Sequence, residues 1–156
     1  MEIIQDDLWD KSHNVVCVTT NSVVTRLGEL VMGGGVALEA KLLYPNLPRA
    51  WGNGILQLQK QYGAIDGNRP QVYIPRSGGR VVVSYPTKHH FKDPSPIELV
   101  RVSAERLVQL ADKEGWEKIY FPAPGCGLGG LKLEDVLSVI APVLDDRFVL
   151  CLKGDK

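Results

Sequence analysis

The chain has 156 residues, enough for one domain with a sizeable core, and we expect a single domain over residues 1–156. The charges of its 18 basic and 18 acidic residues cancel, so no strong net electrostatic attraction to nucleic acid or membrane is expected. Its three cysteines do not suggest a disulfide framework. No apolar run approaches the roughly 20 residues of a membrane span and the N-terminus lacks a signal-peptide pattern, so we expect a cytoplasmic monomer without membrane contacts.

The first half of the chain is predicted to contain strands and helices in alternation. Residues 2–4 form a short strand, and Val15–Val18 is a continuous apolar run, typical of a strand that is covered on both faces. This run ends at Thr19-Thr20-Asn21, whose small polar side chains are expected at the strand's carboxyl end. The glycine-rich segment 31–37 then leads into a helix that Pro45 ends, and a second helix follows.

The second half contains one hairpin and then further alternation of strands and helices. Its expected elements are strands at 71–74 and 80–84 joined by a turn at 75–79, a helix from Ile97 to Gly115, a strand at 118–121, a helix from Leu133 to Leu144 and a strand at 147–152. Strands that alternate with helices, together with one hairpin, predict a mixed sheet with helices on both sides.

Two glycine loops each follow a strand and precede a helix. They are Gly33–Ala37 and Gly125–Gly130. Glycine is needed where the backbone takes a positive φ or comes close to a ligand, and free N–H groups at a helix start favour phosphate. Two such loops that face each other at a sheet's carboxyl end are typical of a diphosphate and sugar site, although the glycines could also serve only as tight turns. The second loop contains G-x-G-x-x-G, but it comes too late in the sequence for a dinucleotide-binding fold to follow.

Four motifs follow one another along the chain: Asp7-Leu8 after the first strand, Asn21 after the second, the Gly33–Ala37 loop, and Pro122 with Gly125–Leu131. In these motifs the sequence resembles a macro domain, the ADP-ribose-binding fold, from Glu2 to Leu152. Tyr85–Phe91 resembles the proline–threonine–lysine loop of the lysine-dependent branch, which includes DarG-type antitoxins acting on ADP-ribosylated DNA and terminal ADP-ribose glycohydrolases acting on glutamate esters. The resemblance implies a three-layer α/β/α sandwich with a mixed sheet of about six strands.

The resemblance also implies roles for individual residues. Asp7 would accept a hydrogen bond from the adenine amino group, Asn21 would lie beside the distal ribose as a catalytic residue, and Lys88 would attack the anomeric carbon of that ribose. The other implied ADP-ribose contacts are Leu8, Gly33, Gly34, Gly35, Val36, Pro122, Gly125, Cys126, Gly127, Leu128 and Gly129. No metal and no cofactor are implied.

The role of Lys88 distinguishes a catalytic protein from one that only binds its ligand. A neutral amine is a good nucleophile toward a sugar carbon that can open to an aldehyde-like centre and form a Schiff base, whereas a surface lysine would only hold phosphate or solvent. Glutamate-ester hydrolases place an aspartate where this chain has Gly129, and DarG-type loops carry a glycine there. Three functions stay open: a hydrolase that removes ADP-ribose from DNA or protein (de-ADP-ribosylation), a reader module that binds ADP-ribose without catalysis, and a phosphatase acting on ADP-ribose 1″-phosphate.

Other candidate residues give less specific evidence of function. Cys126 could be a nucleophile at a helix start, but no partner base is near it in the sequence, so we interpret it as a small loop residue. His89 and His90 lack a third metal ligand. Lys88–Lys92 combines basic residues with Phe91, a pattern that suits contact with a nucleic-acid backbone and stacking on a base. The expected partners are therefore ADP-ribose or an ADP-ribosylated macromolecule, with nucleic-acid contact near Lys88–Lys92.

Overall fold

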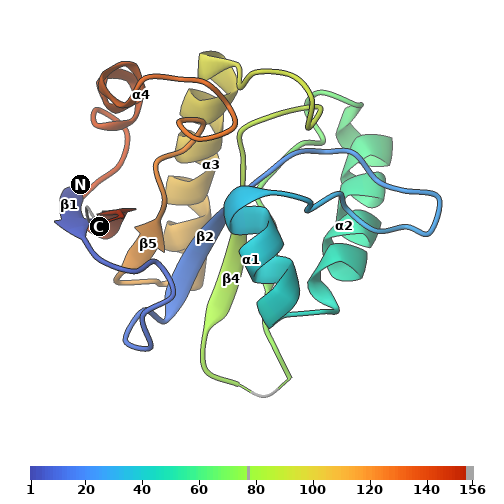
Figure 1. Cartoon of the computed structure of the whole chain (residues 1–156), viewed down its shortest axis with the longest axis horizontal. Coiled ribbons are helices and arrows are strands. Elements are labelled where there is room, and N and C mark those ends of the chain that lie inside the picture. The colour runs from blue at the N-terminus through green and yellow to red at the C-terminus, as the bar shows by residue number, and fades with distance from the viewer. Residues whose placement is uncertain (77, 154–156) are drawn as a thin grey trace.

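Six strands form one sheet with helices on both faces in the computed structural model, which describes residues 1–76 and 78–153 (Figure 1). The strands are β1 (Glu2–Gln5), β2 (Val15–Thr20), β3 (Val72–Tyr73), β4 (Val81–Pro86), β5 (Ile119–Phe121) and β6 (Phe148–Leu152). The helices are α1 (Gly35–Leu43), α2 (Leu47–Tyr62), α3 (Ile97–Glu114) and α4 (Leu133–Ile140). The predicted α/β sandwich with a mixed sheet is confirmed.

The strand order in the sheet is β1-β6-β5-β2-β4-β3. In this order, the five strands β1, β6, β5, β2 and β4 run parallel to their neighbours. The edge strand β3 pairs antiparallel with β4. This arrangement differs from an all-parallel dinucleotide-binding sheet. Because parallel strands end at the same edge of a sheet, the segments that follow β2, β4, β5 and β6 meet there.

Strand β2 lies inside the sheet and is covered on both faces, which explains the continuous apolar run in its sequence. Val18 packs with Ala40 of α1 and Trp51 of α2, whereas Cys17, on the other face, belongs to the core that α3 and α4 complete. Val16 and Val18 on one face and Cys17 on the other are all fully buried. Successive side chains of a strand point to opposite faces, so a strand covered on both sides has no polar alternation.

One predicted helix boundary differs from the structure. Helix α4 ends at Ile140 instead of reaching Leu144, because Pro142 has no N–H to continue the helical hydrogen bonds, although Leu144 is still buried. The predicted hairpin is confirmed by the β3–β4 pairing, but Ser77 in its turn lies outside the described residues, as do residues 154–156 of the predicted domain. No helix in the described part of the chain has both the length and the apolar character needed to cross a membrane.

Candidate functional site

A cavity of about 810 Å³ lies at the carboxyl ends of β2, β4, β5 and β6. Its volume falls in the range of roughly 300–1,000 Å³ that is usual for small-molecule sites. Among the predicted contacts, the cavity is lined by Asn21, Gly33, Gly34, Gly35, Val36, Lys88, Pro122, Gly125, Gly127, Leu128 and Gly129. The two glycine loops and the lysine, which are far apart in the sequence, therefore share one cavity.

The first glycine loop places the start of α1 against the cavity. Gly35 has a φ of +56°, in the left-handed region that favours glycine. The first helical hydrogen bond runs from the Leu38 N–H to the Gly34 carbonyl, at 3.2 Å. The N–H groups of Gly35, Val36 and Ala37 find no hydrogen-bond acceptor among the described residues. All three residues line the cavity, so this helix start offers unpaired donors to a bound anion.

The second glycine loop also presents donors at the cavity. Leu131 N–H donates to the Gly125 carbonyl at 2.9 Å and closes the loop, and Gly125 has a φ of +77°. Within the described chain, the N–H groups of Gly127, Leu128 and Gly129 make no hydrogen bond. Two sets of free backbone donors around one cavity form an arrangement that suits a diphosphate, and neither loop needs a cationic side chain.

Gly129 occupies a position with no room for a side chain. A Cβ there would meet the Ser95 hydroxyl and would lie 2.5 Å from the Gly125 carbonyl oxygen. Ser95 N–H also donates to the Gly129 carbonyl at 2.9 Å, which holds the loop down on the segment before α3. An aspartate at position 129 would therefore collide with the loop itself. Among the described residues, none that lines the cavity is acidic.

Lys88 follows β4 and is fixed through its backbone. The N–H groups of Thr87 and Lys88 both donate to the Thr20 carbonyl, at 3.0 Å and 3.2 Å. The Lys88 carbonyl accepts a hydrogen bond from the buried Asn68 side-chain amide at 2.8 Å. The loop that carries the lysine is thus anchored to the end of β2 on one side and to the segment before β3 on the other.

The Lys88 side chain connects its own loop to the second glycine loop. Its Nζ donates to the carbonyl oxygens of Phe91 and Leu128, both at 3.2 Å. No carboxylate of the described residues lies within ion-pair distance of this amine. The amine is therefore placed at the cavity wall by two neutral acceptors, without a counter-ion.

Asn21 lines the cavity, but its amide is also part of the local structure. Its Nδ2 donates to the Val31 carbonyl and its Oδ1 accepts from the Val23 N–H, both at 2.9 Å. These two hydrogen bonds close the loop between β2 and the first glycine loop. Asn21 thus sets the shape of the wall that it lines.

Three of the predicted contacts do not line the cavity. Asp7 is exposed, and its Oδ1 accepts a hydrogen bond from the Trp9 N–H at 3.0 Å. Leu8 is buried with Val16 and Cys151, and Val36 packs against this cluster. Cys126 packs against the core beside α3 and α4, and burial raises the pKa of its thiol, which disfavours the thiolate that a nucleophile requires.

Sequence reasoning missed several wall residues, namely Val31, Ala123, Cys151, Leu152 and Lys153. The last three lie at the end of β6, and the expectation that parallel strands end together could have indicated them. The two histidines contact different partners: His89 Nδ1 faces Asn68, and the His90 ring stacks on Phe91 with 4.5 Å between centroids. Over residues 1–76 and 78–153, no three metal-ligating side chains cluster together.

Comparison with known proteins agrees with this geometry. The family model described as "Macro domain" matches residues 74–140. A DNA ADP-ribosyl glycohydrolase of Thermus aquaticus is 32% identical over 117 residues, which are 74% of this chain and 31% of that protein. A DNA ADP-ribosyl transferase–DNA ADP-ribosyl glycohydrolase fusion protein of Thermosipho africanus is 23% identical over 92% of this chain and 38% of its own length. The chain thus spans only about a third of these curated relatives.

Solved structures are similar over nearly the whole chain. The macrodomain of Thermus aquaticus DarG superposes with a TM-score of 0.76 at 26% identity, covering 98% of this chain and 97% of that one. Thermosipho africanus DarTG in complex with ADP-ribose has a TM-score of 0.80 at 23% identity, covering 99% of this chain and 42% of that one. The same sheet order and the same layers are therefore expected in these proteins.

Proposed function

Because this chain belongs to the macro-domain family, we propose that it binds ADP-ribose and hydrolyses the ADP-ribosyl linkage to a macromolecule, with Lys88 as the nucleophile. The observation that carries the proposal is that Lys88 and both glycine loops line a single cavity. Binding elements and a nucleophilic amine are thus present at one place, and the rest of the described wall offers no acidic side chain.

The backbone donors supply the binding part of the proposal. The free N–H groups at Gly35–Ala37 and at Gly127–Gly129 would hold the diphosphate of ADP-ribose between the two loops. The relatives whose names specify removal of ADP-ribose from DNA, and the similar structure that contains ADP-ribose, support this ligand. The distal ribose would then lie near Asn21 and Lys88 on the same wall.

The two carbonyl acceptors around the lysine would hold its amine in position for attack. A neutral amine has two N–H groups and one lone pair, so the carbonyls of Phe91 and Leu128 can take both hydrogens and leave the lone pair free. Attack on the anomeric carbon forms the N–C bond while the bond from that carbon to the carrier breaks, and the carrier leaves with the electron pair and takes up the proton that the attacking amine releases. The sugar ring opens to a Schiff base, and water then releases ADP-ribose and regenerates the amine.

The surroundings of the lysine favour DNA over protein as the carrier. Phe91 is 40% exposed and Leu128 is 77% exposed, and their own carbonyls hold the lysine amine. These two apolar side chains next to the reacting carbon suit a flat nucleobase. His90, which stacks on Phe91, and Lys92 extend this surface with groups that match a phosphate backbone.

A reader module without catalysis is the second candidate, and one observation favours it. The described cavity wall contains no carboxylate, so no acidic residue is available there as a general acid or base. In that case Lys88 would only contact the ligand. Binding experiments cannot separate the two candidates, whereas turnover can.

The test is a panel of defined substrates offered to the intact chain. An oligonucleotide ADP-ribosylated on one base, a protein ADP-ribosylated on glutamate, and ADP-ribose 1″-phosphate are each incubated with the protein, and the products are identified by mass spectrometry. The proposal predicts free ADP-ribose from the oligonucleotide and an unmodified base. Tight binding of ADP-ribose with no product from any substrate would establish a reader, and free phosphate from the small molecule would establish a phosphatase.

A further inference from the structure

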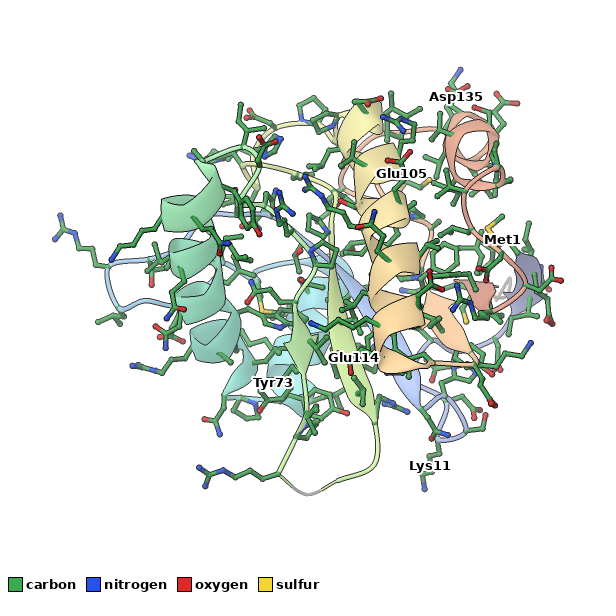
Figure 2. The ribbon with its side chains drawn as sticks, turned by 180° about the vertical axis from the view of Figure 1, so that it is seen from behind. Met1, Lys11, Tyr73, Glu105, Glu114 and Asp135 are labelled. Atoms are coloured by element: carbon green, nitrogen blue, oxygen red, sulfur yellow. The ribbon has the colours of Figure 1, made fainter. Side chains whose placement is uncertain are left out.

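A second, shallower cleft lies on the side of the molecule where α3 covers β4, the side that Figure 2 shows. It has a volume of about 220 Å³ and is formed by one face of α3 and the segment that leads into β3. Its walls carry the side chains of Arg69, Arg106, Gln109 and Lys113, and its apolar lining comes from Pro70 and Leu110. Every charged group that lines it is a cation.

Arg69 is held in place before any ligand arrives. Its guanidinium lies over the Tyr62 ring, 3.6 Å from the ring centroid, and its Nε donates to the Asp66 carbonyl at 2.8 Å. Arginine carries five N–H donors, so the terminal nitrogens keep donors for an anion. A guanidinium that is already stacked loses less conformational freedom on binding than a free one.

The cations of this cleft have no direct ion-pair partner among the described residues. In the described chain, no carboxylate lies within 4.0 Å of Arg69, Arg106 or Lys113. Glu105, the acidic neighbour of Arg106 on α3, is paired with Arg101 at 2.5 Å. Partial burial and the nearby Arg69 lower the pKa of Arg106, so the charges of Asp66 and Glu105 offset the repulsion between the two guanidinium groups only in part. A bound anion would remove this repulsion.

The two cations that α3 contributes to the cleft do not converge on one point. Arg106 and Lys113 lie on the same face of α3, about two turns or roughly 10 Å apart along its axis. A single phosphate ion can contact only one end of such a row, whereas consecutive phosphates of a strand can contact all of it. Asn68, directly before Arg69, donates to the Lys88 carbonyl, so the cleft begins beside the lysine loop.

We propose that Arg69, Arg106 and Lys113 bind the phosphodiester backbone of the nucleic-acid strand whose modified base enters the cavity. This inference rests on the proposed function, because it names the macromolecule that carries the ADP-ribosyl group. The contact is with phosphates, so it adds affinity without sequence preference and weakens with salt.

The test compares two charge-matched variants of the intact chain. The first is Arg69→Ala/Arg106→Ala/Lys113→Ala; the second, Lys11→Ala/Lys41→Ala/Arg49→Ala, removes the same charge from exposed positions elsewhere, among them Lys11 in the loop between β1 and β2 (Figure 2). The binding of an unmodified, fluorescent single-stranded oligonucleotide is measured by anisotropy over a range of salt concentrations. ADP-ribose affinity is measured separately by calorimetry.

The inference predicts that the cleft variant loses roughly tenfold or more in oligonucleotide affinity and that its salt slope falls by about 2, since each single-strand phosphate contact contributes about 0.7. The control variant should keep most of the affinity, and ADP-ribose affinity should be unchanged in both. If the first variant misfolds, Arg106→Gln/Lys113→Gln should still reduce the slope by about 1.

Equal losses in the cleft variant and the control, or no loss in either, would overturn the inference. The same holds if inorganic phosphate displaces the oligonucleotide more strongly than chloride at equal ionic strength, because the cleft would then bind free phosphate ions. Failure of the wild type to bind ADP-ribose would instead reject the proposed function, and the oligonucleotide measurement would still report on the cleft.

Discussion

The Lys88 amine donates a hydrogen bond of 3.2 Å to the Leu128 carbonyl, and this contact joins two loops that lie 40 residues apart in the sequence. It brings the amine to the loop whose free N–H groups would hold the diphosphate. Because the lysine loop is also anchored through its backbone to Thr20 and Asn68, a bound sugar would meet an amine of fixed position. Positioning of this kind lowers the entropic barrier to attack.

Two glycines of one loop are predicted to respond in different ways to substitution. At Gly129, even a Cβ would collide with Ser95 and with the Gly125 carbonyl, so Gly129→Ala should lower the melting temperature. At Gly127, a Cβ would meet nothing within 4 Å, and the residue lines the cavity. Gly127→Leu should therefore fold normally and bind ADP-ribose roughly tenfold or more weakly, as measured by calorimetry.

A second substitution distinguishes the two sources of collision at Gly129. Ser95→Gly removes the hydroxyl but leaves the Gly125 carbonyl 2.5 Å from the added Cβ, so it should not restore the stability of Gly129→Ala. Full recovery in the double variant would mean that the loop backbone can move aside. An unchanged ADP-ribose affinity of Gly127→Leu would show that this loop does not contact the ligand.

Removing the Asn68 amide should loosen the lysine loop. In Asn68→Ala, the Lys88 carbonyl loses a hydrogen bond of 2.8 Å, which should lower the free energy of unfolding by about 1–3 kcal/mol and turnover by roughly tenfold or more. Gln71→Ala is a matched control, because it removes an amide hydrogen bond of 3.1 Å to the Trp51 carbonyl away from the lysine. Urea denaturation and single-turnover kinetics check the prediction, and similar turnover in the two variants would contradict it.

Arg80 should stabilise the segment that contains Asp7 and Leu8. Its guanidinium donates to the carbonyls of Trp9, Asp10 and His13, at 2.9, 2.7 and 3.0 Å. Lysine cannot reproduce this fork of donors, so Arg80→Lys should lose nearly as much stability as Arg80→Ala, on the order of 3 kcal/mol in urea denaturation. A fully stable Arg80→Lys variant would show that charge alone is sufficient at this position.

The buried thiol of Cys151 predicts a loss of stability at alkaline pH. Burial, with the nearby charges of Asp6 and Asp7, raises the pKa of Cys151 from 9.0 to about 11. The unfolded thiol ionises first, so the free energy of unfolding should fall as the pH rises from about 9 to about 11, by on the order of 1–2 kcal/mol. Denaturation curves of the wild type and of Cys151→Ala over this pH range test it, and parallel losses would contradict it.

Local sequence patterns were sufficient for much of the fold and for part of the cavity. The continuous apolar run Val15–Val18 predicts a strand covered on both faces, and each strand–glycine–helix segment predicts free donors at a helix start. Because parallel strands end together, these local patterns also predict that the two loops meet. Lys88 was placed by a resemblance and not by a pattern in its own residues.

Features that depend on neighbours in space could not be read from the sequence. No local pattern encodes the sheet order, which places β6 beside β5, although the rule that parallel strands end together could indicate Cys151 at the same edge of the sheet. The position of Ser95 beneath Gly129 explains why this loop has no side chain there, yet the two residues are distant in the sequence. The Asp7 carboxylate accepts a local hydrogen bond from Trp9, which only coordinates can reveal.

The most direct test of the account is chemical trapping of Lys88 during turnover. Borohydride added while the protein acts on an ADP-ribosylated oligonucleotide should reduce the Schiff base to a stable amine, and mass spectrometry should locate the adduct on Lys88. Lys88→Arg keeps the charge but cannot provide a neutral amine, so it should be as inactive as Lys88→Ala while both variants still bind ADP-ribose. A Lys88→Arg variant with full activity, together with no adduct on the wild type, would contradict the nucleophilic role of Lys88.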